Sequence, residues 1–174
     1  MSKQSLSPAA WIDAGLEQLA ALGPAALRAE PLSRHLNTSK GSFYWHFKDV
    51  PAFQVALLDT WQARVLNKMR ADVNLEGSPT DKLIRFGQMV QFDIAGPALR
   101  AWAQANQAVA STLADVDKAR MDRLSQLLAE VGITNGDFAK AAYGTLVGLQ
   151  QIQMDDGDAL VAYATLVDLA MALE

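Results

Sequence analysis

The sequence predicts an all-α protein of about nine helices. Three observations indicate this class. Alanine, leucine and glutamine are abundant, and the alternating β-branched residues typical of strands are missing. Apolar residues recur every three or four positions in several stretches. Proline, glycine and small polar residues stand between these stretches, where helices begin and end.

The composition limits the kinds of protein the chain could be. At 174 residues, of which 51% are apolar, the chain can bury a core. It has no cysteine, which excludes disulfides, thiol catalysis and thiolate metal sites. Neither a signal peptide nor an apolar run of roughly 18 residues is visible. We therefore expect a cytoplasmic protein that does not enter a membrane.

Three helices are expected before residue 49. The first is expected from about Pro8 to Leu22, because proline suits a first turn and Gly23-Pro24 ends the helix. The second is expected from near Pro31 to Leu36, and the third from after Ser39, a capping residue, to near Phe47. The apolar stripe of the first helix consists of Ile12, Leu16, Leu19 and Leu22.

The fourth helix is expected over about 49–73, with Asp49 as its cap and Pro51 in its first turn. It carries apolar residues every four positions, at Phe53, Leu57, Trp61 and Val65. The segment 75–79 breaks the composition and is the best candidate for a domain boundary. The later helices are expected at about 80–92, 98–105, 107–131 and 135–154, with a last helix after a turn at Asp155-Asp156-Gly157-Asp158.

The most informative stretch runs from Leu32 to Lys48. It holds two short helical segments around a turn signal at Asn37-Thr38-Ser39. The second segment mixes hydroxyl, basic and aromatic side chains, a composition poorly suited to a protein core. Such a helix is well suited to contact phosphates and base edges, so the stretch predicts a helix-turn-helix that docks in the major groove of DNA.

This stretch resembles the recognition helix of TetR-family transcriptional regulators. The match consists of Ser39, Gly41, Tyr44, His46, Phe47 and Lys48. The glycine usual in the family's turn is replaced by Asn37, which tolerates the left-handed conformation. Two later segments, 99–103 and the one through Asp117, Arg120 and Leu124, are similar to a bacterial branch of the family.

The resemblance implies an all-helical homodimer with two kinds of domain. Residues 1–50 would be the helix-turn-helix DNA-binding domain, and the helix at about 49–73 would connect it to the rest. Residues 74–174 would bind a small molecule and supply the dimer interface. No catalytic residue, cofactor or metal site is expected, because the chain has no phosphate loop, nucleophile elbow or cluster of metal ligands.

Ten residues are candidates for contacts with double-stranded operator DNA. Lys40 and Ser42 are expected at base edges or phosphates, Trp45 at a thymine methyl or a sugar, and Tyr44 and Lys48 at phosphates. Gly41 permits close approach to DNA or to a neighbouring helix, and His46 contacts either a phosphate or the fold itself. Phe43 and Phe47 are expected in the core. The full set is Arg34, Thr38, Ser39, Lys40, Gly41, Ser42, Tyr44, Trp45, His46 and Lys48.

The C-terminal half predicts two further sites. Bulky side chains, with Gln150 as a polar anchor, are candidates to line a pocket for a small, largely apolar effector. They are Phe86, Met89, Val90, Phe92, Trp102, Met121, Leu124, Tyr143, Leu146 and Gln150. Arginines 85, 100 and 123 are expected to face solvent.

The last two helices are apolar on more than one stripe, which indicates a four-helix interface between two copies. Its candidates are Gly144, Val147, Gly148, Val161, Ala164 and Asp168.

The sequence therefore predicts a ligand-responsive, homodimeric DNA-binding regulator, most often a repressor. Its net charge of −4 would not by itself suggest DNA. Residues 1–50 hold five basic and four acidic side chains, a net +1, while residues 51–174 hold ten and fifteen, a net −5. Two alternatives stay open. One is a constitutive dimeric DNA-binding protein without an effector, and the other is a small helical enzyme.

Overall fold

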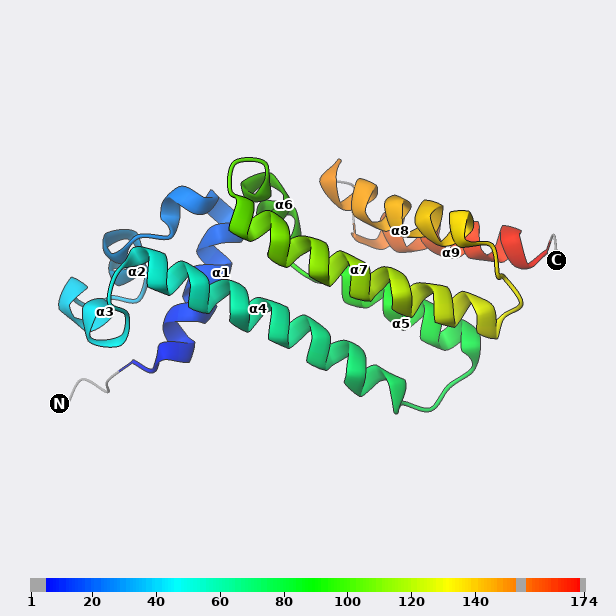
Figure 1. Ribbon diagram of the computed structural model, residues 1–174, viewed down its shortest axis with the longest axis horizontal. Helices are drawn as coiled ribbons and strands as arrows, with labels where there is room; N and C mark the ends of the chain where they lie inside the picture. The colour runs from blue at the N-terminus through cyan, green and yellow to red at the C-terminus, as the bar shows by residue number, and fades with distance from the viewer. Residues whose placement is uncertain (1–5, 153–155, 173–174) are drawn as a thin grey trace. The chain divides into compact units, whose positions relative to one another are not determined.

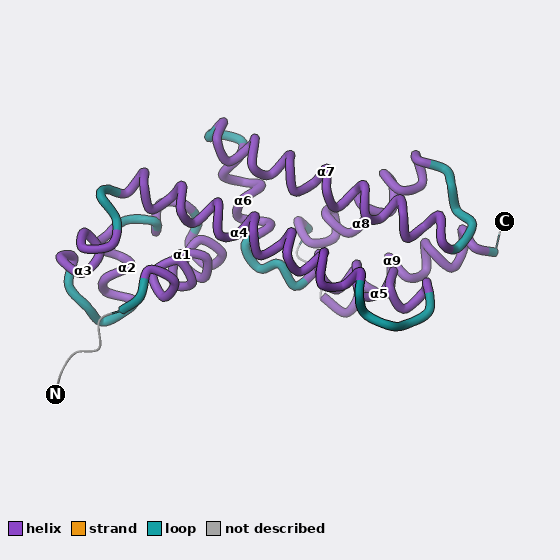
Figure 2. Tube along the Cα trace, turned by 60° about the horizontal axis from the view of Figure 1, so that its bottom comes forward, coloured by secondary structure: helices purple, strands orange, loops and turns teal. Residues whose placement is uncertain are grey.

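The computed structural model describes residues 6–152 and 156–172, and this part of the chain holds helices and loops but no strand (Figures 1 and 2). Its helices are α1 (Pro8–Leu22), the short 3-10 helix η1 (Pro24–Ala26), α2 (Ala29–His35), α3 (Lys40–His46), α4 (Val50–Val73), α5 (Pro79–Gln91), α6 (Gly96–Ala103), α7 (Gln107–Glu130), α8 (Gly136–Gln151) and α9 (Asp156–Met171).

The chain forms two compact units. The first comprises residues up to Val65 together with Ile94–Leu113, and the second comprises Leu66–Asp93 together with the chain from Ala114 onward. Helices α4 and α7 each contribute to both. The functional division expected from the sequence, DNA binding by residues 1–50 and ligand binding from residue 74, remains a prediction beside these structural units.

The all-α class and the expected helices are confirmed, with small differences at the ends. Helix α2 begins at Ala29, two residues before Pro31. Helix α8 ends at Gln151, three residues before its expected end. The expected turn at 155–158 is wrong for its last three residues, because α9 already begins at Asp156. Residue 155 lies outside the described part.

Aromatic rings form the interior of the first unit. The ring of Phe43 on α3 stands edge-on to Trp11 of α1 at 5.4 Å and to Phe53 of α4 at 5.3 Å between centroids. Phe47 lies 4.9 Å from Phe53. Edge-to-face pairs at these distances are favourable. One aromatic cluster therefore joins α1, α3 and α4, and it confirms Phe43 and Phe47 as core residues.

Helices α1 and α4 pack closely because α1 carries a glycine at their contact. A Cβ atom on Gly15 would lie 2.7 Å from Phe53 Cζ and 2.7 Å from Leu57 Cδ1, closer than non-bonded atoms approach. The expected apolar stripe of α4 is buried along its length. The stripe expected on α1 is wrong at its last residue, Leu22, which is exposed at the end of the helix.

In the second unit, α5 lies against α8 and α9. Helix α5 begins with a reciprocal cap, in which the Ser78 hydroxyl accepts from the Asp81 backbone and the Asp81 carboxylate accepts from the Ser78 backbone. Gly87 brings α5 close to α9, since a Cβ there would lie 2.9 Å from Tyr163 Cδ1. Asn135 caps α8 by accepting from the backbone of Asp137 at 2.9 Å.

The interior of the second unit also contains polar contacts. Arg120 on α7 pairs with Asp93 at 2.8 Å and is almost completely buried. Gln91 donates to the Leu146 carbonyl at 2.7 Å. The Gln150 amide lies 3.3 Å from each of the carbonyl oxygens of Val90, Gln91 and Asp93, so α8 caps the end of α5. These contacts tie α5, α7 and α8 together.

Candidate DNA-binding surface

The turn between α2 and α3 has the backbone that a helix-turn-helix requires. Asn37 adopts φ 49°, a left-handed conformation that asparagine tolerates. The Thr38 backbone N–H donates to the Ser33 carbonyl at 2.8 Å and closes the turn. Helices α2 and α3 are packed against each other. Asparagine thus serves where a glycine would otherwise be expected.

Helix α3 separates an inner from an outer face. The Ser39 hydroxyl accepts from the Ser42 backbone at 3.3 Å and caps the helix, as expected. Phe43 is fully buried, whereas Tyr44 is 54% exposed and Trp45 83% exposed. The ring of Tyr44 still packs edge-on against Phe43 at 5.3 Å. Helix α3 is therefore anchored by one aromatic residue and presents two others outward.

All ten residues proposed from the sequence to contact DNA lie on the surface or at its edge. Seven are exposed and three are half-buried. The exposed ones are Arg34, Ser39, Lys40, Gly41, Tyr44, Trp45 and Lys48. The half-buried ones are Thr38, Ser42 and His46. They come from α2, the turn, α3 and the residues that follow it, so one helix-turn-helix presents the whole set.

The structure bears on two residues whose roles were open. A Cβ on Gly41 would have only the Ser39 hydroxyl oxygen nearby, at 3.6 Å, so packing within the chain does not require glycine there. The Nε2 atom of His46 is buried and has no hydrogen-bond partner within the described residues. Its ring lies against Phe47, with 6.3 Å between centroids.

An acidic residue lies among the candidate cations, and the sequence reasoning missed it. Glu30 on α2 pairs with Lys40 at 2.8 Å and with Arg34 at 3.3 Å. The hydrogen bond from Lys40 is the main cause that lowers the pKa of the Glu30 carboxyl. The four-residue spacing of Glu30 and Arg34 could have indicated their pair. The pair with Lys40 crosses the turn, and no local pattern reveals it.

Comparison with solved structures identifies the fold. A protein assigned to the TetR family of transcriptional regulators, from Rhodococcus sp., aligns with a TM-score of 0.75 at 22% identity, over 94% of this chain and 98% of its own. The chain has the TetR fold. The fatty acid degradation regulator FadR from Bacillus halodurans aligns with a TM-score of 0.68 at 17% identity, over 95% and 96%.

A third example of the TetR fold is the regulatory protein TetR from Rhodobacter sphaeroides. It aligns with a TM-score of 0.67 at 22% identity, over 91% of this chain and 95% of its own. No family model matches the sequence, and no curated protein matches it at a significant level. The three alignments each cover more than nine-tenths of this chain, and they agree with the all-α fold expected from the sequence. No helix in the described ranges is long and apolar enough to cross a membrane.

The candidate effector-pocket residues divide between the two units. Trp102 belongs to the first unit, and the other nine belong to the second. Phe92 is exposed, while Met121 and Gln150 are half-buried. The remaining six are buried and form part of the second unit's interior: Phe86, Met89, Val90, Leu124, Tyr143 and Leu146. Of the ten, only Met89 and Phe92 line the groove described below.

The candidate dimer residues lie on the sides of α8 and α9 that the described chain leaves accessible. Gly144, Val161 and Asp168 are exposed, whereas Val147, Gly148 and Ala164 are half-buried. A Cβ on Gly144 or Gly148 would meet no atom within 4 Å. These glycines are therefore not required for packing within the chain.

The expectation that arginines 85, 100 and 123 face solvent is wrong, because all three are half-buried. The Nε of Arg123 and the Nη2 of Arg85 are buried. Arg85 donates through Nε to Asp72 at 2.8 Å, across the loop that joins α4 to α5. These two residues are thirteen positions apart, so no helical spacing could indicate their contact.

Proposed function

We propose that this chain is a DNA-binding transcriptional regulator that acts in the cytoplasm as a homodimer. The observation that carries the proposal is the outer face of α3. Tyr44 and Trp45 are exposed there beside Lys40 and Lys48, on a helix held by buried Phe43. Exposed aromatic rings on a small, rigid helix suit a surface that a partner covers. The TetR fold of the whole chain supports DNA as that partner.

The residues of this face would make two kinds of contact. Lys48, Tyr44, Arg34 and Thr38 would contact phosphates, which supply affinity without sequence preference. Helix α3 would enter the major groove, where the side chain of Trp45 meets a thymine methyl or a sugar. Ser42 and Lys40 would meet base edges in the same groove.

Two copies of the chain would associate through α8 and α9. Val161 and Leu169 on α9 are 65% and 59% exposed, which leaves apolar surface uncovered. The open glycines of α8, Gly144 and Gly148, would allow the partner's helices to approach closely. A two-fold symmetric dimer would present one helix-turn-helix to each of two half-sites about 34–36 Å apart. Because the two subunits are identical, we expect a palindromic operator.

Effector control completes the proposal. A small molecule bound by the second unit would shift the dimer between geometries that do and do not fit the operator. In the simplest form the free dimer represses and the bound dimer releases DNA. If a screen finds ligands that stabilise the protein and none changes its affinity for DNA, the chain is instead a constitutive DNA-binding dimer.

The test begins with a selection of DNA fragments bound by the purified chain, followed by fluorescence anisotropy titrations at several salt concentrations. Lys48→Ala should weaken binding to all sequences and reduce the log–log salt slope by roughly 0.9 per subunit. Glu30→Gln should have the opposite effect, because it removes a negative charge from this face and frees Arg34 for a phosphate and Lys40 for a base edge. Lys118→Ala, an exposed lysine of α7, is the matched control and should change neither quantity.

Unchanged DNA affinity and unchanged salt slope in both Lys48→Ala and Glu30→Gln would show that this face is not part of the DNA interface.

The dimer is tested separately by sedimentation. Val161→Glu places an unpaired charge in the proposed interface, which costs on the order of 2–5 kcal/mol. It should yield folded monomers that lose operator binding, and an intact dimer would place the interface elsewhere.

A further inference from the structure

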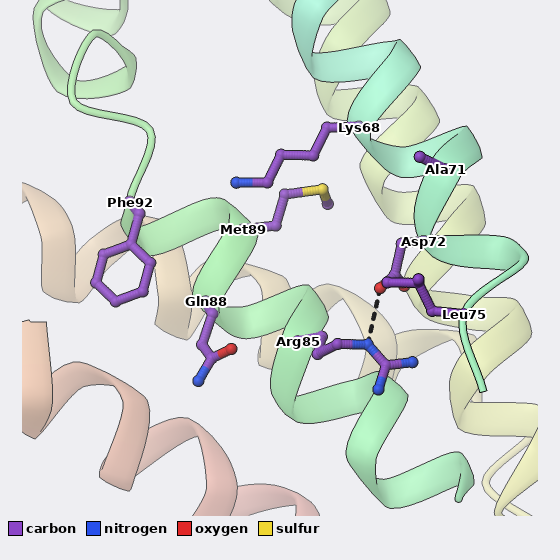
Figure 3. Close-up of a pocket in the computed structure, with 8 residues that line it drawn as sticks. All are labelled: Lys68, Ala71, Asp72, Leu75, Arg85, Gln88, Met89 and Phe92. Carbon is purple, nitrogen blue, oxygen red and sulfur yellow. Dashed lines mark hydrogen bonds and ion pairs between the residues drawn. The ribbon is translucent and has the colours of Figure 1, made fainter. Parts of the chain in front are cut away.

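A groove lies within the second unit, between the C-terminal end of α4 and the facing side of α5. Its volume is about 280 Å³, and it is partly open to solvent. Figure 3 shows that its side chains come from both helices and from the residues that follow each of them. The lining consists of Lys68, Ala71, Asp72, Leu75, Arg85, Gln88, Met89 and Phe92.

Part of the lining is apolar surface that the chain itself does not cover. Leu75 and Phe92 are 53% and 55% exposed, although both are large apolar side chains. Met89 is buried and forms part of the wall between them. A methionine adapts its shape to a ligand more readily than a branched side chain does. This part of the groove suits a hydrocarbon chain.

The other part of the lining is charged, with two cations and one carboxylate. Lys68 is exposed, and Arg85 is half-buried and pairs through Nε with Asp72 at 2.8 Å (Figure 3). The Nη2 atom of Arg85 is buried and has no acceptor within the described residues. The groove therefore has one net positive charge, and part of the Arg85 side chain remains accessible.

We propose that this groove binds a small amphipathic carboxylate. Its hydrocarbon chain would lie along Leu75, Met89 and Phe92, and its carboxylate would lie against Lys68 or the accessible part of Arg85. A carboxylate supplies the negative charge that balances the net positive charge of the groove. A neutral ligand supplies no charge, and an amine would be repelled by the two cations. The modest volume favours a short or medium chain, because pockets for drug-sized ligands hold roughly 300–1,000 Å³.

This inference deepens the proposed function, on which it rests for its regulatory consequence alone. The sequence favoured a largely apolar effector among the bulky residues of α5–α8. The groove instead involves α4 and an arginine that the sequence placed in solvent. Because ligand binding is measured on the free protein, its failure is distinguishable from a failure of DNA binding.

The experiment compares three probes of the same chain length: octanoate, octanol and octylamine. Binding to the full chain is measured by calorimetry and by the rise in melting temperature, since a ligand of the native state raises stability. Octanoate should bind most tightly, octanol more weakly and octylamine least. Equal binding of octanoate and octanol would overturn the proposal, because the charged part of the groove would then contribute nothing.

Two variants test the cations. Arg85→Gln should weaken octanoate binding by roughly tenfold and leave octanol binding unchanged. Lys68→Gln should weaken octanoate binding by roughly two- to fivefold, since Lys68 is exposed. Lys68 lies outside the Arg85–Asp72 pair, so its variant tests the site even if Arg85→Gln fails to fold. Lys118→Gln is the control. An advantage of octanoate over octanol that is as large in Lys68→Gln as in the unmodified chain would refute the assignment.

The site is located by nuclear magnetic resonance of ¹³C-labelled methionine methyl groups, with Met89 assigned by Met89→Leu. Octanoate should shift the Met89 signal and leave that of Met121, which lies outside the groove lining, in place. A Met89 shift that follows protein concentration and not octanoate would assign the groove to a second copy and overturn the proposal. Octanoate that binds as expected without changing operator affinity would confirm the site and refute its role as an effector site.

Discussion

The two units of the chain bury different chemistry. Among the described residues of the first unit, Ser33 is the one polar side chain that is fully buried, and the centre is a cluster of aromatic rings. The second unit buries Arg120 and Gln91 among aliphatic side chains. Buried atoms without a partner occur in both. In the first they are ring nitrogens of Trp11 and His46, and in the second they include nitrogens of three arginines.

This difference fits the two tasks proposed for the units. Close-packed rings have few alternative arrangements, so the first unit holds α3 in one orientation. Buried charges and amides are costly when incompletely paired, and a ligand or a rearrangement that completes their hydrogen bonds is favoured. We infer that the first unit is the rigid part of the regulator and that the second is the part whose conformation responds to a ligand.

The largest effect is expected from breaking the aromatic cluster. Phe43→Ala removes a fully buried ring that contacts Trp11, Phe47 and Phe53, and it should lower the free energy of unfolding by about 3–5 kcal/mol. Urea denaturation followed by circular dichroism measures the change. If the loss stayed below about 1 kcal/mol, the cluster would not be what fixes α3.

Trp45→Ala, two positions along the same helix, is the matched variant. Its side chain is 83% exposed, so the free energy of unfolding should change by about 0.5 kcal/mol or less. DNA binding should nevertheless be weakened. The two variants together separate the inner face of α3, which carries stability, from the outer face, which carries recognition.

A somewhat smaller effect is expected from the buried charge in the second unit. Arg120→Met removes the buried cation that pairs with Asp93 at 2.8 Å and should cost about 3 kcal/mol, the lower end of the range for buried pairs, because Asp93 keeps some exposure. Lys118→Met breaks an exposed pair with Asp122 on the same helix and should cost about 0.5 kcal/mol or less. Equal losses in the two variants would contradict a special role for buried charge.

The sequence predicted the first unit more completely than the second, and the reason is physical. The turn at Asn37, the cap at Ser39 and the inward direction of Phe43 are local features, set by residues a few positions apart. Chain proximity therefore indicates them directly. The exposed positions of Tyr44 and Trp45 follow from the helical period once Phe43 is known to be buried.

The features that could not be predicted depend on contacts between distant parts of the chain. The Arg85–Asp72 pair, the groove beside it and the Arg120–Asp93 pair each join residues thirteen or more positions apart. Helical periodicity shows which residues share a face, but it does not show which face meets which. The beginning of α9 was misjudged for a different reason, since acids and glycine favour a turn as well as a first helical turn.

The smallest effect sharpens the comparison at one hydroxyl group. The Tyr163 hydroxyl is buried and has no hydrogen-bond partner in the described part of the chain. Tyr163→Phe should therefore raise the free energy of unfolding by up to about 1 kcal/mol. Tyr143→Phe is the matched variant, because that hydroxyl donates to Asp117 at 2.7 Å, and it should be destabilising. A loss of stability in Tyr163→Phe would show that this hydroxyl has a partner after all.

The same variant predicts a change with pH. Burial raises the pKa of the Tyr163 phenol, so the native chain keeps its proton where the unfolded chain releases it, above about pH 10. A raised pKa in the native state means that stability is present below the unfolded pKa and is lost as pH rises past it. Tyr163→Phe removes this loss, so its advantage over the unmodified chain should grow above about pH 10. An advantage that stays constant with pH would show that the phenol ionises as readily in the native state, and that Tyr163 is not enclosed by α5 and α9.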